Sequence, residues 1–214
     1  MSLESRLKKQ LTGALESVDE QGTTGPRHID DAQRLWRRVQ KLLKLDLVAD
    51  ADLQAMELAC YALQLPMRNV KLLSSGKLGR TNLKDRTEQA AELLITTLAD
   101  HADEELLDRA TRLLHEVPHR PPMLEDARLL ADALNLEDFG VVGLLNQMIQ
   151  LARQGDGILQ LAEGSEKREQ YGYWEARLKD GFHFEPVRQI AKRRLARARQ
   201  IASTLADELK EDEP

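Results

Sequence analysis

The sequence contains few of the residues that build disulfide-linked or membrane-spanning proteins. A single cysteine, Cys60, excludes an internal disulfide. No apolar run approaches the roughly 18 residues that a helix needs to cross a bilayer. The N-terminal stretch also contains no apolar signal-peptide core. We therefore expect a cytoplasmic protein with no membrane segment.

The chain also lacks an excess of positive charge, because 36 acidic residues outnumber 31 lysines and arginines and give a formal net charge of −5 at pH 7. Proteins that bind nucleic acid need a basic surface to neutralise phosphate groups, so we expect no nucleic-acid partner. One predicted helix near the C-terminus is an exception, and its basic residues are Arg188, Lys192, Arg193, Arg194, Arg197 and Arg199. This helix presents either a solvated face or a contact for a phosphate group or a protein partner.

Strand-like alternation of Val, Ile and Thr is absent from the sequence. Apolar side chains recur instead at three- and four-residue steps, which is the spacing of a buried helix face. Three such stripes are Leu35, Val39 and Leu42; Leu94, Ile95 and Leu98; and Leu106, Leu107, Ala110, Leu113 and Leu114. The sequence therefore predicts an all-α protein with a single helical bundle of about eight to ten helices, the last of them roughly 25 residues long.

Glycine and proline clusters divide these helices. Three prolines exclude helix between residues 117 and 123. Glycines predict further breaks at residues 154–157 and 164–165. The resulting segments are an N-terminal accessory helix and linker over residues 1–25, a helical domain over residues 26–205 and an acidic C-terminal tail over residues 206–214.

Residues 125–143 are the most informative stretch of the sequence. An Asp-Ala pair is followed there by two glycines, at Asp132, Ala133, Gly140 and Gly143. This segment resembles the one that closes the metal site in HD-superfamily phosphohydrolases, with Leu134 where that family has a second Asp. The resemblance implies an HD-like helical bundle that descends from a hydrolase.

Residues 28–39 are similar to the HD-superfamily helix that carries the first metal-binding His. That His usually lies five residues before a Trp-like position, and Trp36 places Asp31 there, with His28 about one turn earlier. Asp31 is therefore a candidate ligand. The alternative is that Asp30 and Asp31 simply favour the positive end of a helix dipole.

Residues 52–66 look like the family helix that ends in the adjacent His-Asp pair. The pair falls at Leu63 and Gln64, and neither is a ligand of the expected kind. Further along, His115 matches a family position that carries a His, and His119 lies nearby. Together these two form either a near-neutral titrating pair, or one packed core histidine and one loop residue.

The resemblance covers residues 27–205 and implies a divalent metal that activates water and polarises a phosphoryl oxygen. Of the four expected ligands, only Asp132 has the same residue type as in the family. It is either a residual metal ligand or a hydrogen-bond acceptor. We predict no cofactor and no assigned catalytic residue; the alternative is a divalent metal such as Mn, Fe, Ni or Mg. The pocket candidates are His28, Asp31, Leu63, Gln64, His115 and Asp132.

Two functional hypotheses follow from this degenerate metal site. The first is a non-catalytic binding or regulatory module that keeps a pocket for a small phosphorylated ligand, with a protein partner or homo-oligomer as further partners. The second is a divergent metal-dependent phosphohydrolase that acts on a nucleotide or phosphate ester. Both predict that Leu63 and Gln64 lie beside Asp132, because helix order and apolar faces are kept.

Overall fold

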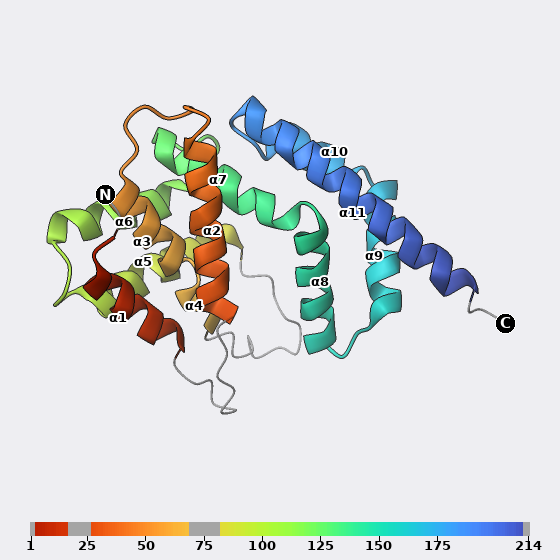
Figure 1. Ribbon diagram of the computed structural model, residues 1–214, viewed down its shortest axis with the longest axis horizontal. Coiled ribbons are helices and arrows are strands. Elements are labelled where there is room, and N and C mark those ends of the chain that lie inside the picture. The colour runs from red at the N-terminus through yellow and green to blue at the C-terminus, as the bar shows by residue number, and fades with distance from the viewer. Residues whose placement is uncertain (1–2, 17–26, 69–81, 212–214) are drawn as a thin grey trace. The chain divides into compact units, whose positions relative to one another are not determined.

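A computed structural model describes residues 3–16, 27–68 and 82–211, which form helices joined by turns, with no strand among them (Figure 1). The all-α fold class predicted from the sequence is therefore confirmed. No helix in this part of the chain combines the length and the apolar character needed to cross a membrane. The end of the predicted N-terminal segment, residues 17–25, lies outside the described residues.

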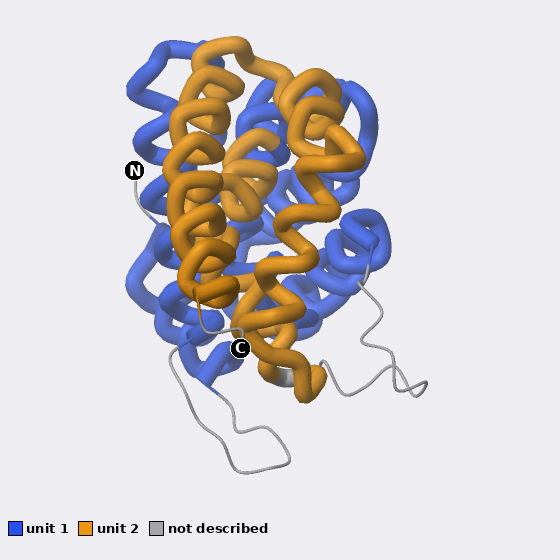
Figure 2. Tube along the Cα trace, turned by 90° about the vertical axis from the view of Figure 1, so that its right-hand side faces the viewer, with its two compact units in different colours: residues 1–131 blue, residues 132–214 orange. Residues whose placement is uncertain are grey.

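The helices fall into two compact units, residues 1–131 and 132–214, which Figure 2 shows in different colours. The helices are α1 (Ser5–Glu16), α2 (Arg27–Leu43), α3 (Leu53–Ala62), α4 (Leu65–Arg68), α5 (Leu83–Leu98), α6 (Glu104–Glu116), α7 (Glu125–Asp138), α8 (Val141–Arg153), α9 (Ile158–Gln170), α10 (Tyr173–Asp180) and α11 (Glu185–Glu211). The boundary lies inside α7. The single domain predicted over residues 26–205 spans this boundary, and its extent stays a prediction.

Unit 1 is built around α3, which is apolar on almost every side. All of its residues from Ala55 to Ala62 are buried, and the helix packs against α2, α5 and α6. Asp52 starts the helix, because its Oδ1 accepts hydrogen bonds from the backbone N–H groups of Gln54 and Ala55 at 3.1 and 3.0 Å. The sequence positions matched to the family's His-Asp pair directly follow this buried helix.

The N-terminal helix α1 belongs to the core of unit 1. Lys8 Nζ lies 2.9 Å from Glu57 Oε1 on α3, and the backbone N–H of Leu3 donates to Glu57 Oε2 at 3.1 Å. Glu57 is therefore a buried carboxylate with a cation and a backbone donor as partners. The buried side chains that α1 adds to the core are Leu7, Leu11 and Leu15.

Unit 2 contains the end of α7 and the helices α8 to α11. Its aromatic core is centred on Phe139, whose ring meets Trp174 and Phe182 edge to face at centroid distances of 5.1 and 5.2 Å. α11 spans 27 residues, close to the predicted length. It continues to Glu211 and so includes most of the acidic tail predicted over residues 206–214.

Two of the predicted breaks are confirmed and one is wrong. Residues 117–123 separate α6 from α7, and residues 154–157 separate α8 from α9. Residues 164–165, in contrast, lie inside α9. Gly164 faces α8 there, and a Cβ at this position would lie 3.5 Å from Gln147 Nε2. The glycine therefore marks a contact between two helices rather than the end of one.

Candidate functional site

The six predicted pocket residues are divided between the two units. Five belong to unit 1: His28 and Asp31 on α2, Leu63 and Gln64 directly after α3, and His115 on α6. Asp132 lies on the part of α7 that belongs to unit 2. A shared pocket for all six, and the expected proximity of Leu63 and Gln64 to Asp132, therefore stay predictions.

Asp132 is fully buried, and the backbone uses both of its carboxylate oxygens. Oδ1 accepts a hydrogen bond from the N–H of His183 at 2.8 Å, and Oδ2 accepts one from the N–H of Phe184 at 3.0 Å. Those two residues directly precede α11, where backbone N–H groups have no partner within the helix. Asp132 therefore fixes the start of α11 on α7, which is the hydrogen-bond role that the sequence left open.

Burial raises the pKa of Asp132 to about 6, although the N–H groups of His183 and Phe184 and the charge of Arg188 lower it. A carboxyl group that titrates near neutral pH is a frequent feature of catalytic acids and bases. This one has no exposed surface, so a substrate cannot reach it in the observed conformation. Its titration therefore bears on stability rather than on exchange of protons with a substrate.

Asp31 is held by arginines of its own helix. Arg34 Nη2 lies 2.8 Å from Asp31 Oδ1, and Arg27 Nε lies 3.8 Å from Oδ2. Asp30 also occupies the first turn of α2, where a negative charge favours the helix dipole. His28 is half-buried at the start of the same helix. These contacts support the structural explanation for the acidic pair.

Leu63 and Gln64 are both buried in unit 1. Leu63 offers only its backbone carbonyl, which accepts a hydrogen bond from Arg86 Nε at 3.0 Å. Gln64 is 3% exposed, and its Nε2 has no hydrogen-bond partner among the described residues. A buried amide N–H without an acceptor is costly, and the described contacts do not account for it.

The histidines near the end of α6 do not form a buried pair. His115 is exposed on α6, and His119 is exposed in the turn that follows, with Nδ1 at 3.9 Å from a Glu116 carboxylate oxygen. The expectation that one of them packs in the core is therefore wrong. Pro118 ends the helix between them, so their four-residue spacing does not place them on one helix face.

The positions that match the family's metal ligands do not fit a divalent metal. A metal site needs several donor atoms with free lone pairs, whereas Leu63 has none on its side chain and Asp132 already accepts two N–H groups. Among the described residues of either unit, no three His, Cys, Asp or Glu side chains gather into a group that could hold a metal.

Comparisons with known proteins assign no family to this chain. No protein-family model, no curated protein and no solved structure matches it. The likeness to the HD superfamily therefore rests on the sequence segments alone, and the function has to be inferred from geometry.

A concave site with a largely apolar lining lies within unit 2, and sequence reasoning missed it. It is a cavity of ≈ 620 Å³ between α8, α9 and α11, with Trp174 of α10 also in its lining. We call it the unit 2 groove. It is defined chiefly by Leu144 and Gln147 of α8, Leu159, Glu163 and Glu166 of α9, and Leu195, Ala198, Ala202, Ala206, Asp207 and Leu209 of α11.

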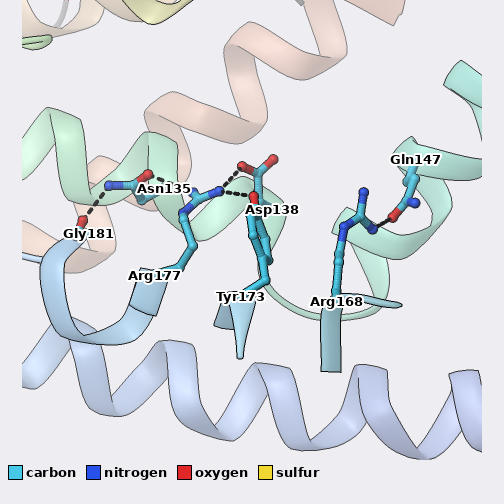
Figure 3. A network of polar contacts seen from close by, with 7 residues as sticks. All are labelled: Asn135, Asp138, Gln147, Arg168, Tyr173, Arg177 and Gly181. Atoms are coloured by element: carbon cyan, nitrogen blue, oxygen red, sulfur yellow. Dashed lines mark hydrogen bonds and ion pairs between the residues drawn. The ribbon is translucent and has the colours of Figure 1, made fainter. Parts of the chain in front are cut away.

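Polar contacts hold the helices beside this groove, and three of the residues that make them, Asp138, Gln147 and Arg168, line it (Figure 3). Arg177 of α10 donates to Asn135 Oδ1 at 2.8 Å, to Asp138 Oδ2 at 3.0 Å and to the Tyr173 hydroxyl at 2.8 Å. Arg168 of α9 donates to Gln147 of α8. These hydrogen bonds join α7 to α10 and α8 to α9, and the Arg168 guanidinium lies over the Tyr173 ring at 5.7 Å, which links α9 to α10.

The charges around the groove are mostly acidic. Its lining contains five carboxylates (Asp138, Glu163, Glu166, Glu169 and Asp207) and three cations (Arg168, Arg199 and Lys210). Arg199 is held by Glu169 and Glu175, with N–O distances of 2.6 and 2.7 Å. The hydrogen bonds to these two carboxylates raise the pKa of Arg199 further above its ordinary value. Asp138 and Glu163 also have cations beside them, Arg177 at 3.0 Å and Lys167 at 3.6 Å, so the excess negative charge of the groove comes chiefly from Glu166 and Asp207.

Two sequence signals could have located the groove. Seven of the eleven residues of α8 from Val141 to Leu151 are apolar, with Asn146, Gln147 and Gln150 on one side, a pattern that predicts an amphipathic helix with a wide apolar face. Alanines recur every fourth residue along α11, at Ala198, Ala202 and Ala206. Such a stripe of small side chains permits close approach of a second apolar surface.

Proposed function

We propose that the protein is a non-catalytic binding module on an HD-like helical fold. One observation carries this proposal: the carboxylate at the best-matched metal position, Asp132, is fully buried and accepts a backbone N–H at each oxygen from the two residues that precede α11. In this arrangement the carboxylate holds the start of α11 against α7, which is a structural role, and its burial keeps it away from a metal in solution.

The positions expected for the family's His-Asp pair support the same conclusion. Leu63 cannot donate an electron pair from its side chain, and the Gln64 amide oxygen is neutral and compensates poorly for a carboxylate. With Leu134 in place of a second Asp, the matched positions have lost negative charge as well as donor atoms. A metal held by one or two remaining carboxylates would be weakly bound and mostly hydrated.

The binding site of this module is the unit 2 groove. Its volume lies within the range of about 300–1,000 Å³ that is typical of ligand sites, and its lining combines apolar side chains with polar and charged ones. None of the six residues predicted from the resemblance lines it. The acidic lining disfavours the small phosphorylated ligand that was expected from the sequence, and favours a neutral or basic ligand.

Metal content and turnover test this proposal directly. The full-length protein, expressed with added manganese, iron, nickel and magnesium, is expected to bind none of them stoichiometrically by elemental analysis. It is also expected to leave a panel of nucleotides and phosphate esters intact. Near-unit occupancy, with turnover that Asp132→Ala abolishes, would instead establish the divergent phosphohydrolase.

A further inference from the structure

The lining of the unit 2 groove extends along several turns of α11 and α9, which suits an elongated ligand. Its residues on α11 run from Leu195 to Lys210, a distance of about 22 Å at 1.5 Å per residue. On α9 they run from Leu159 to Glu169, or about 15 Å. A site with these proportions matches the side of a helix of four turns better than a compact small molecule.

The floor of the groove allows another helix to approach closely. Ala198, Ala202 and Ala206 lie on one face of α11 at successive four-residue steps, so no large side chain fills the space above the helix backbone. Packed helices lie about 8–10 Å apart, and the shorter distances require small residues at the contact. Leu159, which is 57% exposed at the groove edge, offers apolar surface to such a helix.

The charges along the groove favour a partner that carries positive charge. Glu163 and Glu166 border it on α9, and Asp207 borders it on α11. The last turns of α11 carry Asp207, Glu208 and Glu211 against one cation, Lys210, at the helix end where a dipole favours positive charge. Lysine or arginine side chains from a partner would relieve this unfavourable arrangement.

From these three features we infer that the unit 2 groove docks a basic amphipathic helix of another polypeptide. Its apolar face, with large residues three and four positions apart, lies over the alanines of α11 and against Leu144 and Leu159. Its basic flanks meet Glu163, Glu166 and Asp207. The inference rests on the proposed function, since it specifies the ligand of the same site.

A synthetic peptide tests the chemistry of this partner. The probe is a fluorescein-labelled peptide of about 18 residues with leucines on one helical face and lysines elsewhere, and its control carries glutamate in place of lysine. Fluorescence anisotropy with the full-length protein is expected to show at least about tenfold tighter binding of the lysine peptide. The affinity is expected to fall as salt rises from about 50 to about 200 mM. Equal binding of the two peptides, or no binding, overturns the inference.

Matched variants locate the site on the protein. Ala202→Phe fills the groove floor, whereas Ala196→Phe adds the same ring on the exposed side of α11, outside the groove. We expect the first to weaken lysine-peptide binding by about tenfold or more, and the second by less than about twofold. Thermal unfolding checks that both variants fold. Equal losses in the two variants would place the peptide elsewhere and overturn the inference.

Adjacent charge reversals give a second test that does not disturb packing. Asp207 lines the groove and Glu208 does not, and both are exposed. Asp207→Lys is expected to weaken binding of the lysine peptide several-fold more than Glu208→Lys does. The opposite ranking, or equal effects, contradicts the inference.

The same variants distinguish other outcomes. A dimer in sedimentation analysis that Ala202→Phe dissociates identifies a second copy of the chain as the occupant, and overturns a separate partner. Metal content and phosphoester turnover are measured on the unmodified protein. An active metalloenzyme would therefore refute the proposed function, whereas failed peptide binding alone would refute only this inference.

Discussion

Helix α3 in unit 1 and helix α8 in unit 2 are both rich in apolar side chains, yet their surroundings differ. Every residue of α3 from Ala55 to Ala62 is buried, including the carboxylate of Glu57. No described side chain of α8 is buried, and Val142, Leu145 and Ile149 are 44%, 56% and 42% exposed. The same kind of sequence therefore has two different environments in one chain.

The difference lies in the number of covering helices. α3 packs against α2, α5 and α6 and is tied to α1 through Glu57. α8 packs against α9 and α11, which leaves the stripe of Val142, Leu145 and Ile149 uncovered. An exposed stripe of large apolar side chains is unusual for a helix of a monomeric protein. None of these three residues lines the unit 2 groove, so unit 2 exposes a second apolar surface, whereas α3 in unit 1 exposes none between Ala55 and Ala62.

The largest effect is expected for truncation of a leucine in α3. Leu58→Ala leaves a cavity in the core of unit 1 because Leu58 is fully buried, and we expect a loss of about 3 kcal/mol or more in the free energy of unfolding. The matched change on α8, Leu145→Ala, removes a side chain that is 56% exposed. It should cost less than about 0.5 kcal/mol.

Urea denaturation followed by circular dichroism measures both changes. If the two units unfold separately, two transitions appear, and each variant is compared within its own transition. A loss for Leu145→Ala as large as that for Leu58→Ala would show that α8 is covered in solution, and would remove the contrast between the two helices.

The second prediction concerns the two buried carboxylates. Glu57 in unit 1 has the Lys8 cation beside it, whereas Asp132 in unit 2 has backbone N–H partners and a pKa raised from 3.8 to about 6. Between these pH values the native state binds more protons than the unfolded state at Asp132. The contribution of Asp132 to stability therefore falls as the pH rises from about 4 to about 6, by at most about 3 kcal/mol.

The variant Asp132→Asn isolates this contribution, because asparagine does not titrate. We expect the stability of the unmodified protein, relative to the variant, to decrease as the pH rises through this window and to level off above it. Denaturation at several pH values measures the difference. Parallel curves for the two proteins would show that the carboxyl group titrates at an ordinary pKa.

A smaller effect is expected where α1 covers α3. Lys8→Ala leaves the buried Glu57 carboxylate without its cation, while the hydrogen bond from the Leu3 N–H remains. Because the Lys8 side chain is 42% exposed, solvent screens the pair and we expect a loss of about 1 kcal/mol. Thermal unfolding of each variant measures the loss. Lys9→Ala changes an exposed neighbour on α1 and should leave the free energy of unfolding almost unchanged. Equal shifts would show that α1 contributes through its leucines alone.

The sequence was sufficient for the fold class, because helical periodicity and proline breaks are local properties of the chain. The breaks at residues 117–123 and 154–157 were predicted correctly, and so was the approximate length of the last helix. It failed at residues 164–165, since a glycine at a helix contact and a glycine at a helix end have the same local signal. Only the position of Gln147 on α8 distinguishes them.

The candidate site was much harder to predict. Resemblance drew attention to Asp132, but its backbone partners at His183 and Phe184 are about fifty residues away along the chain, a long-range contact that no motif encodes. The unit 2 groove arises from surface that three helices leave unfilled. The periodicity of α8 and α11 shows that these helices are apolar, and it does not show which of their faces remain uncovered.

The smallest predicted effect tests how loosely α8 packs. Gly164 lies inside α9, and an added Cβ would meet only the end of the Gln147 side chain, at ordinary contact distance. Gly164→Ala should therefore raise the free energy of unfolding by about 0.5 to 1 kcal/mol, because alanine restricts the unfolded chain and favours helix. Gly13→Ala in α1, where nothing lies within 4 Å of the new Cβ, should give a similar gain. Gly172→Ala should instead lower stability, since φ is +62° there. A loss at Gly164 with a gain at Gly13 would mean that α8 and α9 are packed as tightly as the helices of unit 1.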